Sequence, residues 1–192
     1  AGQLFAIHGF KAVTSKMICA KAQVNAAAVN YHFGNREGLY RAVLLETHQY
    51  LANVNMLSQL VKSPLSPQKK LEWIIRLILD QLNHTDWHIR FYIREAMDFN
   101  EIFTEVFLQQ ATPKTQLMRQ IFSQITGLPP EDDRLPATVL TALSPCVFAL
   151  IANKNAVESA WGVKIFELDK LAQHISQFAW AGIQGMKEKS RE

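Results

Sequence analysis

The chain has 192 residues, of which 48% are hydrophobic and 19% are charged, and its formal net charge is +3. This composition excludes an intrinsically disordered protein and predicts a soluble globular protein of one or two domains. The two cysteines, Cys19 and Cys146, lie far apart in the sequence, so we expect neither a disulfide framework nor a zinc site, and we place the protein in the reducing cytoplasm.

Four short helices are predicted in the first fifty residues. The first ends at Gly9, and the next three end near residues 22, 33 and 50. Helices this short are marginal in water on their own, so we expect them to pack against one another. The side chains that can cap the last three are Thr14 or Ser15, Asn25 and Asn35.

The rest of the chain also has helical periodicity, and strand signals are absent. We expect an all-α fold with a three-helix helix-turn-helix domain at residues 1–48 and a larger helical bundle at 49–192. The uncharged run at 135–153 is long enough to cross a membrane, but two prolines and several hydroxyls favour a buried or subunit-facing helix. The predicted helices cover residues 67–82, 86–97, 100–126, 135–161 and 168–186. We expect a kink at Pro113 in the third of these.

The second and third helices predict a helix-turn-helix, in which the third would enter the major groove of DNA. The first 49 residues carry five basic and two acidic residues, which account for the whole net charge and suit a surface that faces phosphates. Ala26 and Ala27 are small enough for close approach to DNA, and Val29 and Phe33 would anchor the helix to its own core. The side chains that can reach phosphates or bases are those of Asn25, Asn30, Tyr31 and His32.

A purely structural alternative exists for several of these residues. Tyr31, His32 and Phe33 could pack the small domain, and the lysines could be ordinary solvated charges. The helix-turn-helix prediction does not depend on any one of them.

The segment "LFAIHGFKAVTSKMICAKAQVNAAAVNYHFGNREGLY" resembles the TetR/AcrR family of bacterial transcription regulators, and less specifically its CecR-like branch. The resemblance covers the first forty residues, where caps, turn and aromatic cluster agree in order and spacing. The matching positions are Leu4, Phe5, Gly9, Phe10, Thr14, Ile18, Ala22, Val24, Tyr31, His32, Phe33, Asn35, Glu37 and Leu39.

The resemblance implies a homodimer that binds palindromic double-stranded operator DNA and is released by a small effector in the larger domain. It implies phosphate contacts at Thr14, Ser15 and Lys16, and a further backbone contact at Arg36, where the family commonly has lysine. Gln23 departs from the glycine usual in the turn. The recognition helix would contain Asn25, Ala26, Ala27, Asn30, Tyr31 and His32. At the position of Asn30 many members of the family have tyrosine.

The stretch "HTDWHIRFYIREAMDF" brings aromatic and charged side chains to the middle of the larger domain, as an effector pocket requires. Aromatic residues at helical spacing are more often part of a core, so both interpretations stay open. The candidate pocket residues are Trp87, Phe91, Arg94 and Glu95, joined by Cys146, Phe148 and Trp180, which could line the same space or a dimer interface.

Other chemistry is weakly indicated. His84 and His88 have the spacing of two metal ligands on a helix, but Asp86 between them is better explained as a helix cap. The paired carboxylates, such as Glu101 with Glu105, accompany no nucleophile or glycine loop. We therefore expect no catalytic residue, no metal and no cofactor; an all-helical carrier or enzyme with a coincidental helix-turn-helix is the alternative.

The last two predicted helices each have an apolar face. One lies at residues 143–151, and the other includes Ala172, Ile175, Phe178, Ala179, Gly182 and Ile183. In the family such a pair forms a four-helix bundle with its copy, which suits an interface that uses the same patch on both subunits. Burial within one subunit is the alternative.

Overall fold

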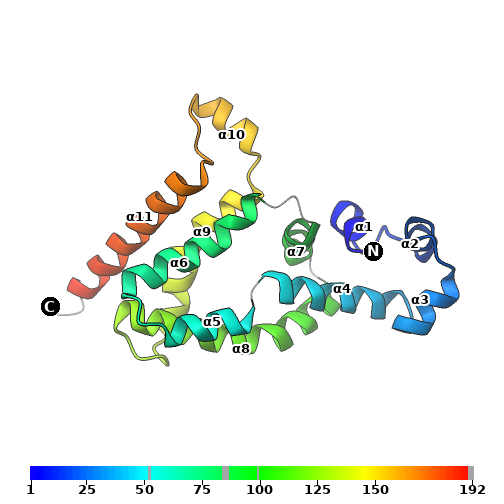
Figure 1. Cartoon of the computed structure of the whole chain (residues 1–192), viewed down its shortest axis with the longest axis horizontal. Coiled ribbons are helices and arrows are strands. Elements are labelled where there is room, and N and C mark those ends of the chain that lie inside the picture. Colours follow the sequence, from blue (N-terminus) through cyan, green and yellow to red (C-terminus); the bar gives the residue numbers. More distant parts are fainter. Residues whose placement is uncertain (52, 84–86, 99, 190–192) are drawn as a thin grey trace. The chain divides into compact units, whose positions relative to one another are not determined.

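The computed structural model covers the whole chain, and the structure describes residues 1–51, 53–83, 87–98 and 100–189. The regular secondary structure of these described residues is helical, without a strand, which confirms the predicted all-α fold (Figure 1). Contacts divide the chain into two compact units. Unit 1 comprises residues 1–53 and 86–114, and unit 2 comprises residues 54–85 and 115–192.

Unit 1 is built around three aromatic side chains that are fully buried: Phe5, Tyr40 and Phe91. Tyr40 meets both phenyl rings edge-on, with centroids 5.4 Å from Phe5 and 5.9 Å from Phe91. Through these rings α7 packs against α1 and α4. The helices of unit 1 are α1 (Gly2–His8), α2 (Ser15–Ala22), α3 (Ala26–Phe33), α4 (Arg36–Leu51), α7 (Trp87–Met97) and the first part of α8 (Glu101–Thr126).

The predicted caps of the short helices are confirmed. Thr14 Oγ1 accepts a hydrogen bond from the amide of Met17 at 3.3 Å. Asn25 Oδ1 accepts one from Ala28 at 2.9 Å, and Asn35 Oδ1 accepts one from the amide of Gly38 at 2.8 Å. Each cap satisfies a backbone N–H that has no partner inside its helix.

The turn between α2 and α3 contains a non-glycine residue in the left-handed region. Gln23 has φ 56° and ψ 41°, and its amide donates to the carbonyl of Cys19. A side chain in this conformation costs roughly 1 kcal/mol relative to glycine. The departure at Gln23 therefore leaves the turn geometry in place and makes it less stable.

Unit 2 has its own apolar core, in which α6 packs against α9 and α11. Leu71, Ile75, Phe122 and Leu135 are fully buried in it. The helices of unit 2 are α5 (Val54–Lys62), α6 (Pro67–Leu79), the 3₁₀ helix η1 (Asp80–Asn83), the last part of α8, α9 (Arg134–Ile151), α10 (Lys154–Trp161) and α11 (Leu168–Lys189).

One prediction about these helices was wrong, and one helix was missed. The expected continuous helix at 135–161 is broken: Ala152 is extended, and Asn153 caps α10 by accepting from the amide of Ala156 at 3.1 Å. Helix α5 was not predicted at all. The predicted Asp86 cap and His84 lie outside the described residues.

Helix α9 is long and apolar enough to cross a membrane by length and composition alone. Core helices of soluble proteins can be equally long and apolar. The inner face of α9, including Leu135 and Cys146, is buried in unit 2. One such helix is weak evidence for a membrane span.

Candidate nucleic-acid interface

Helix α3 exposes nearly all of its side chains. Val29 is the one residue of this helix that is buried, whereas Tyr31 is 85% exposed. The aromatic ring of Tyr31 meets the His32 imidazole edge-on with centroids 5.0 Å apart. The structure thus brings the predicted recognition residues onto one helix and leaves them accessible. These residues are Asn25, at the cap, and Ala26, Ala27, Asn30, Tyr31 and His32, all of them exposed.

Phe33 does not anchor α3 as expected. Phe33 is 40% exposed and is the last residue of α3, which Gly34 caps. Val29 alone among the residues of α3 reaches the core of unit 1.

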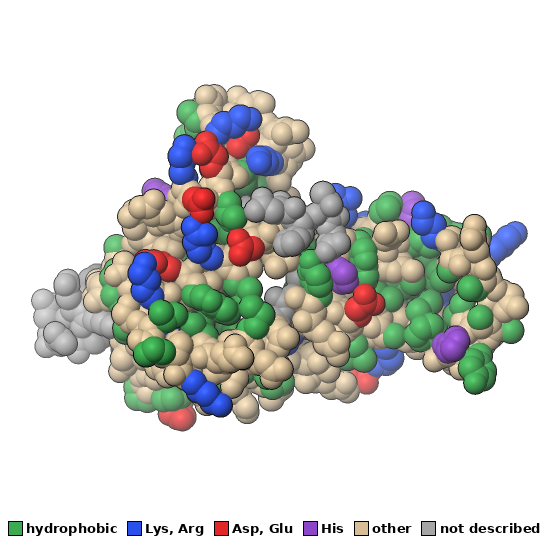
Figure 2. Space-filling model, viewed as in Figure 1, with side chains coloured by type: hydrophobic (Ala, Val, Ile, Leu, Met, Phe, Trp, Pro, Cys, Tyr) green, Lys and Arg blue, Asp and Glu red, His purple; other side chains and the backbone are tan. Residues whose placement is uncertain are grey.

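The beginning of α2 is also accessible. Thr14, Ser15 and Lys16 are exposed, and the first amides of the helix point away from its body. A helix N-terminus carries partial positive charge, so it favours a phosphate. Neither α2 nor α3 contains an acidic residue, and on the face drawn in Figure 2 the surface in the region of both helices carries mainly hydrophobic side chains with a few basic and histidine ones among them.

Arg36 holds the loop that precedes α2. Its Nη1 donates to the carbonyls of Phe10 and Val13, at 2.7 Å each, and its guanidinium lies 4.1 Å from the centroid of the Phe10 ring. Phe10 in turn stacks on Tyr40 with centroids 4.2 Å apart. Arg36 therefore fixes the chain immediately before Thr14, which sequence reasoning did not foresee.

The predicted pocket residues of α7 are part of the unit 1 framework. Phe91 is fully buried, and the Glu95 carboxylate accepts a hydrogen bond from the Tyr40 hydroxyl. Arg94 Nη1 donates to the carbonyl of Ile7 at 3.1 Å, and Trp87 packs against the unit 1 core. Burial raises the pKa of Glu95, and burial followed by the Glu95 hydrogen bond raises that of Tyr40. These four residues lie close together in unit 1.

The other three predicted pocket residues belong to unit 2. Cys146 is buried in the core and Trp180 is partly buried against it, whereas Phe148 is exposed. Burial raises the pKa of the Cys146 thiol to about 11. A ligand-binding role for any of the seven stays a prediction.

A buried histidine in unit 1 was missed by the sequence analysis. His48 is 4% exposed, and its ring meets that of Tyr92 edge-on at 5.3 Å. Lys114 Nζ donates to the His48 carbonyl at 2.5 Å. Burial, and secondarily the charge of Lys114, lowers the pKa of His48 to about 4. A histidine within an otherwise apolar helical face is the only sequence signal that could have indicated it.

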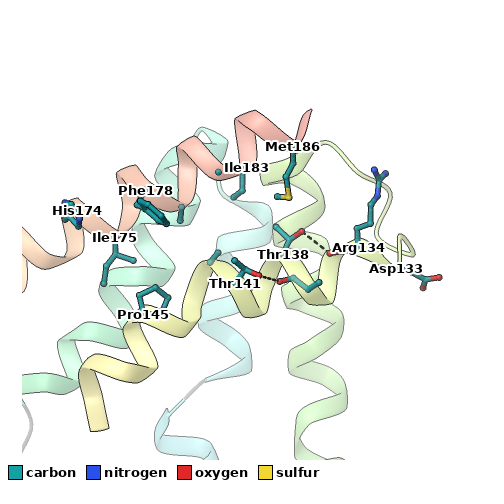
Figure 3. A pocket seen from close by; sticks show the side chains of 14 residues that line it. Asp133, Arg134, Thr138, Thr141, Pro145, His174, Ile175, Phe178, Ile183 and Met186 are labelled. Carbon is teal, nitrogen blue, oxygen red and sulfur yellow. Dashed lines mark hydrogen bonds between the residues drawn. The ribbon is translucent and has the colours of Figure 1, made fainter. Parts of the chain in front are cut away.

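Helices α9 and α11 enclose an apolar groove of about 720 Å³ in unit 2 (Figure 3). Its polar residues are the threonines Thr138 and Thr141 of α9, His174 of α11, and Asp133 with Arg134 at one end. Phe178 projects from α11 into this region and is 76% exposed. Large apolar side chains on α9 are exposed as well: Leu140, Val147, Phe148 and Ile151.

Metal ligation is not indicated in the described part of the chain. Among those residues, no three or more His, Cys, Asp or Glu side chains lie together in a group suited to an ion. The His88 ring instead stacks with the ring of Tyr50 and with that of Trp87, with centroids 4.1 and 3.8 Å apart.

Two family models match the chain. Residues 1–43 match the model of bacterial regulatory proteins, tetR family. Residues 67–183 match the model of the C-terminal domain of the HTH-type transcriptional dual regulator CecR. The second match covers more than half of the chain.

Individual proteins agree with these matches. The uncharacterized HTH-type transcriptional regulator YvkB of Bacillus subtilis (strain 168) is 30% identical over 121 residues, which are 63% of this chain and 59% of that protein. The alignment thus spans less than two thirds of YvkB.

Solved structures share the fold. The fatty acid degradation regulator FadR from Bacillus halodurans aligns with a TM-score of 0.69 at 15% identity, covering 94% of both chains. A regulatory protein in the tetR family from Rhodococcus RHA1 gives 0.65 at 16% identity, with 95% of this chain and 92% of that one covered. GusR of Salmonella enterica gives 0.63 at 16% identity, covering 97% and 91%.

Proposed function

Because this chain belongs to the tetR family of bacterial regulatory proteins, with a C-terminal domain of the CecR type, we propose that it is a cytoplasmic repressor that binds a palindromic operator as a homodimer and leaves it when a small effector binds. The observation that carries this proposal is α3, which exposes its polar and aromatic side chains and buries only Val29. Residues 1–48 would bind DNA, and residues 49–192 would bind the effector and the second subunit.

Phosphate contacts would fix the register of the protein on DNA. Thr14, Ser15 and Lys16 present a hydroxyl-rich and basic helix start, which suits the phosphate backbone. Arg36 carries a positive charge next to this start and holds the preceding loop in place. These contacts supply affinity without distinguishing one sequence from another.

Base contacts would come from α3. The amide of Asn30 can bond two positions of an adenine edge, and Ala26 with Ala27 allows the backbone to approach the groove closely. Tyr31 and His32 offer a hydroxyl and an imidazole for phosphates or bases. Two copies of α3 would bind half-sites about one helical turn apart, or a multiple of it.

Release would pass through α7. This helix packs against α1 and α4, which carry the helix-turn-helix, and it contains Trp87 and Arg94 of the predicted effector site. An effector that binds the protein more tightly when α7 is in one of two positions would shift the equilibrium between these positions. The two recognition helices would then no longer fit both half-sites at once.

The test is selection of random duplex DNA by the purified protein, sequenced at low and at higher salt. We expect an enriched palindrome whose recovery falls steeply with salt. A Tyr31→Ala, His32→Ala variant should lose the enrichment, while Gln173→Ala, an exposed change on α11, should keep it. Failure of the wild-type protein to enrich any sequence at either salt would contradict the proposed function.

A further inference from the structure

One face of α11 has a symmetric order of side chains about Gly182, which is exposed. Large residues stand four positions to either side, Phe178 and Met186, and small residues stand three positions to either side, Ala179, which is half-buried against the unit 2 core, and Gly185. All four flank Gly182 on one face of the helix, because three- and four-residue steps return to the same side. Such a palindromic pattern is what a helix needs to pack against an antiparallel copy of itself about a two-fold axis.

Gly182 has no evident purpose within its own subunit. A Cβ atom added there would meet no heavy atom within 4 Å in the part of the chain that the structure describes, other than the helix's own backbone, and the same is true at Gly185. Both lie inside α11 without a positive φ. Glycine inside a helix destabilises it by about 1 kcal/mol relative to alanine. A close approach from outside the subunit gives a reason for both.

The adjacent groove suits an apolar occupant. The hydroxyls of Thr138 and Thr141 donate to carbonyls of their own helix, those of Arg134 and Ala137, at 2.9 and 2.8 Å (Figure 3). The threonines therefore present methyl groups and need no hydrogen bond from a ligand. Between Lys170 and Lys187 the sequence of α11 contains no Asp, Glu, Lys or Arg.

We propose that the occupant is a second copy of this chain, whose α11 crosses α11 of the first in antiparallel orientation at Gly182. The two-fold axis passes beside Gly182, so Phe178 of one copy lies level with the partner's Met186, but the two project from opposite edges of the contact face, and the partner residue on the same edge as Phe178 is one position away, at 185. Phe178 then lies over the partner's Gly185, and Met186 lies over the partner's Ala179. Each large side chain then faces a small one. The Phe178 rings and Met186 thioethers of both copies lie along the grooves between α9 and α11.

This antiparallel register, with the crossing at Gly182, rests on the proposed homodimer. The existence of a dimer does not by itself imply this register. Many pairings of two apolar helices would produce a dimer. Only a crossing at Gly182 places that residue opposite itself and pairs Phe178 with the partner's Gly185.

Disulfide cross-linking tests the crossing point. In a Cys19→Ser, Cys146→Ala background, Gly182→Cys should form a cross-linked dimer rapidly under mild oxidation, since a disulfide needs Cα atoms roughly 4.4–6.8 Å apart. Gln177→Cys is the matched control: it is exposed on the same helix but lies outside the groove, and it should stay uncross-linked. Equal cross-linking of both variants, or of neither, would overturn the register.

A size exchange tests the pairing without oxidation. Gly185→Leu should raise the dimer dissociation constant at least about tenfold by overpacking against Phe178, and Phe178→Ala added to it should restore much of the affinity. Circular dichroism verifies that each variant folds, and analytical ultracentrifugation measures association. A double variant that associates no better than Gly185→Leu alone would contradict the pairing.

The wild-type protein separates the two proposals. If it stays monomeric at all concentrations measured, the homodimer of the proposed function fails and the register fails with it. If it is dimeric while Gly182→Cys does not cross-link, the register alone is wrong.

Discussion

Acidification should destabilise this protein through His48. In the folded chain its pKa is about 4, against 6.5 for an exposed histidine. A folded-state pKa below the unfolded value means that the unfolded chain binds the proton more readily. The stability that His48 contributes is therefore fully present above pH 6.5 and is lost as the pH falls towards 4.

The size of the effect follows from the two pKa values. The full difference corresponds to about 3 kcal/mol of unfolding free energy, and about 2 kcal/mol of it should be lost by pH 5. That is a large part of the stability of an ordinary domain. The imidazole is buried near Tyr92 and Phe107, so an aliphatic side chain of similar size fits the same surroundings.

The perturbation is His48→Leu, and the assay is urea unfolding followed by circular dichroism at fixed protein concentration, at pH 7.5 and pH 5. Between pH 7.5 and pH 5 the unfolding free energy of the wild-type protein should fall by about 2 kcal/mol more than that of the variant. His8→Gln, at an exposed histidine, is the control and should behave like the wild-type protein. Equal losses in wild type and His48→Leu would refute the assignment of this acid sensitivity to His48.

Four further predictions concern unit 1. Asn30→Ala should change the relative affinities for operator variants by roughly 1–3 kcal/mol if Asn30 bonds a base; unaltered ratios in a competition binding assay would exclude that role. Arg36→Lys keeps the charge but cannot bond both loop carbonyls and cover Phe10, so binding should weaken while the slope of affinity against salt stays the same; wild-type affinity would show that charge alone matters. Gln23→Gly should stabilise the fold by about 0.5–1 kcal/mol in thermal or urea unfolding, because glycine accepts the left-handed turn; a loss of stability would contradict the strain argument. Burial raises the pKa of Glu95, so its stabilising contribution is present below the unfolded value of 4.5 and is lost as the pH rises through the folded pKa. Glu95→Gln should flatten this decline in a series of urea unfolding measurements taken upward from pH 4.5, and an unchanged decline would assign it to other groups.

Local signals in the sequence were sufficient for the helix-turn-helix. Thr14, Asn25 and Asn35 cap their helices because each depends only on an amide three residues further along the chain. The break at Asn153 uses the same signal, but the apolar pattern continues across it and favours a single unbroken helix. Capping residues were therefore more informative than hydrophobic periodicity at helix boundaries.

Burial in three dimensions was beyond the sequence pattern. Glu95 looked like a pocket carboxylate, but Tyr40, 55 residues away in the chain, meets it inside unit 1. Arg36 likewise looked like a phosphate contact alone, and its bonds to Phe10 and Val13 join segments more than twenty residues apart. Such partners are fixed by tertiary packing, which a single sequence does not specify position by position.

The single buried residue of α3 has a consequence for how such a regulator can diverge. Because Val29 alone among the residues of this helix ties it to the core, substitutions at Ala26, Ala27, Asn30 and Tyr31 perturb few packing contacts. Changes on an exposed helical surface usually alter stability by less than about 0.5 kcal/mol. Gene duplicates could therefore explore new operator sequences without first losing a folded protein, and a library randomised at these four positions should be rich in folded members from which altered specificities can be selected.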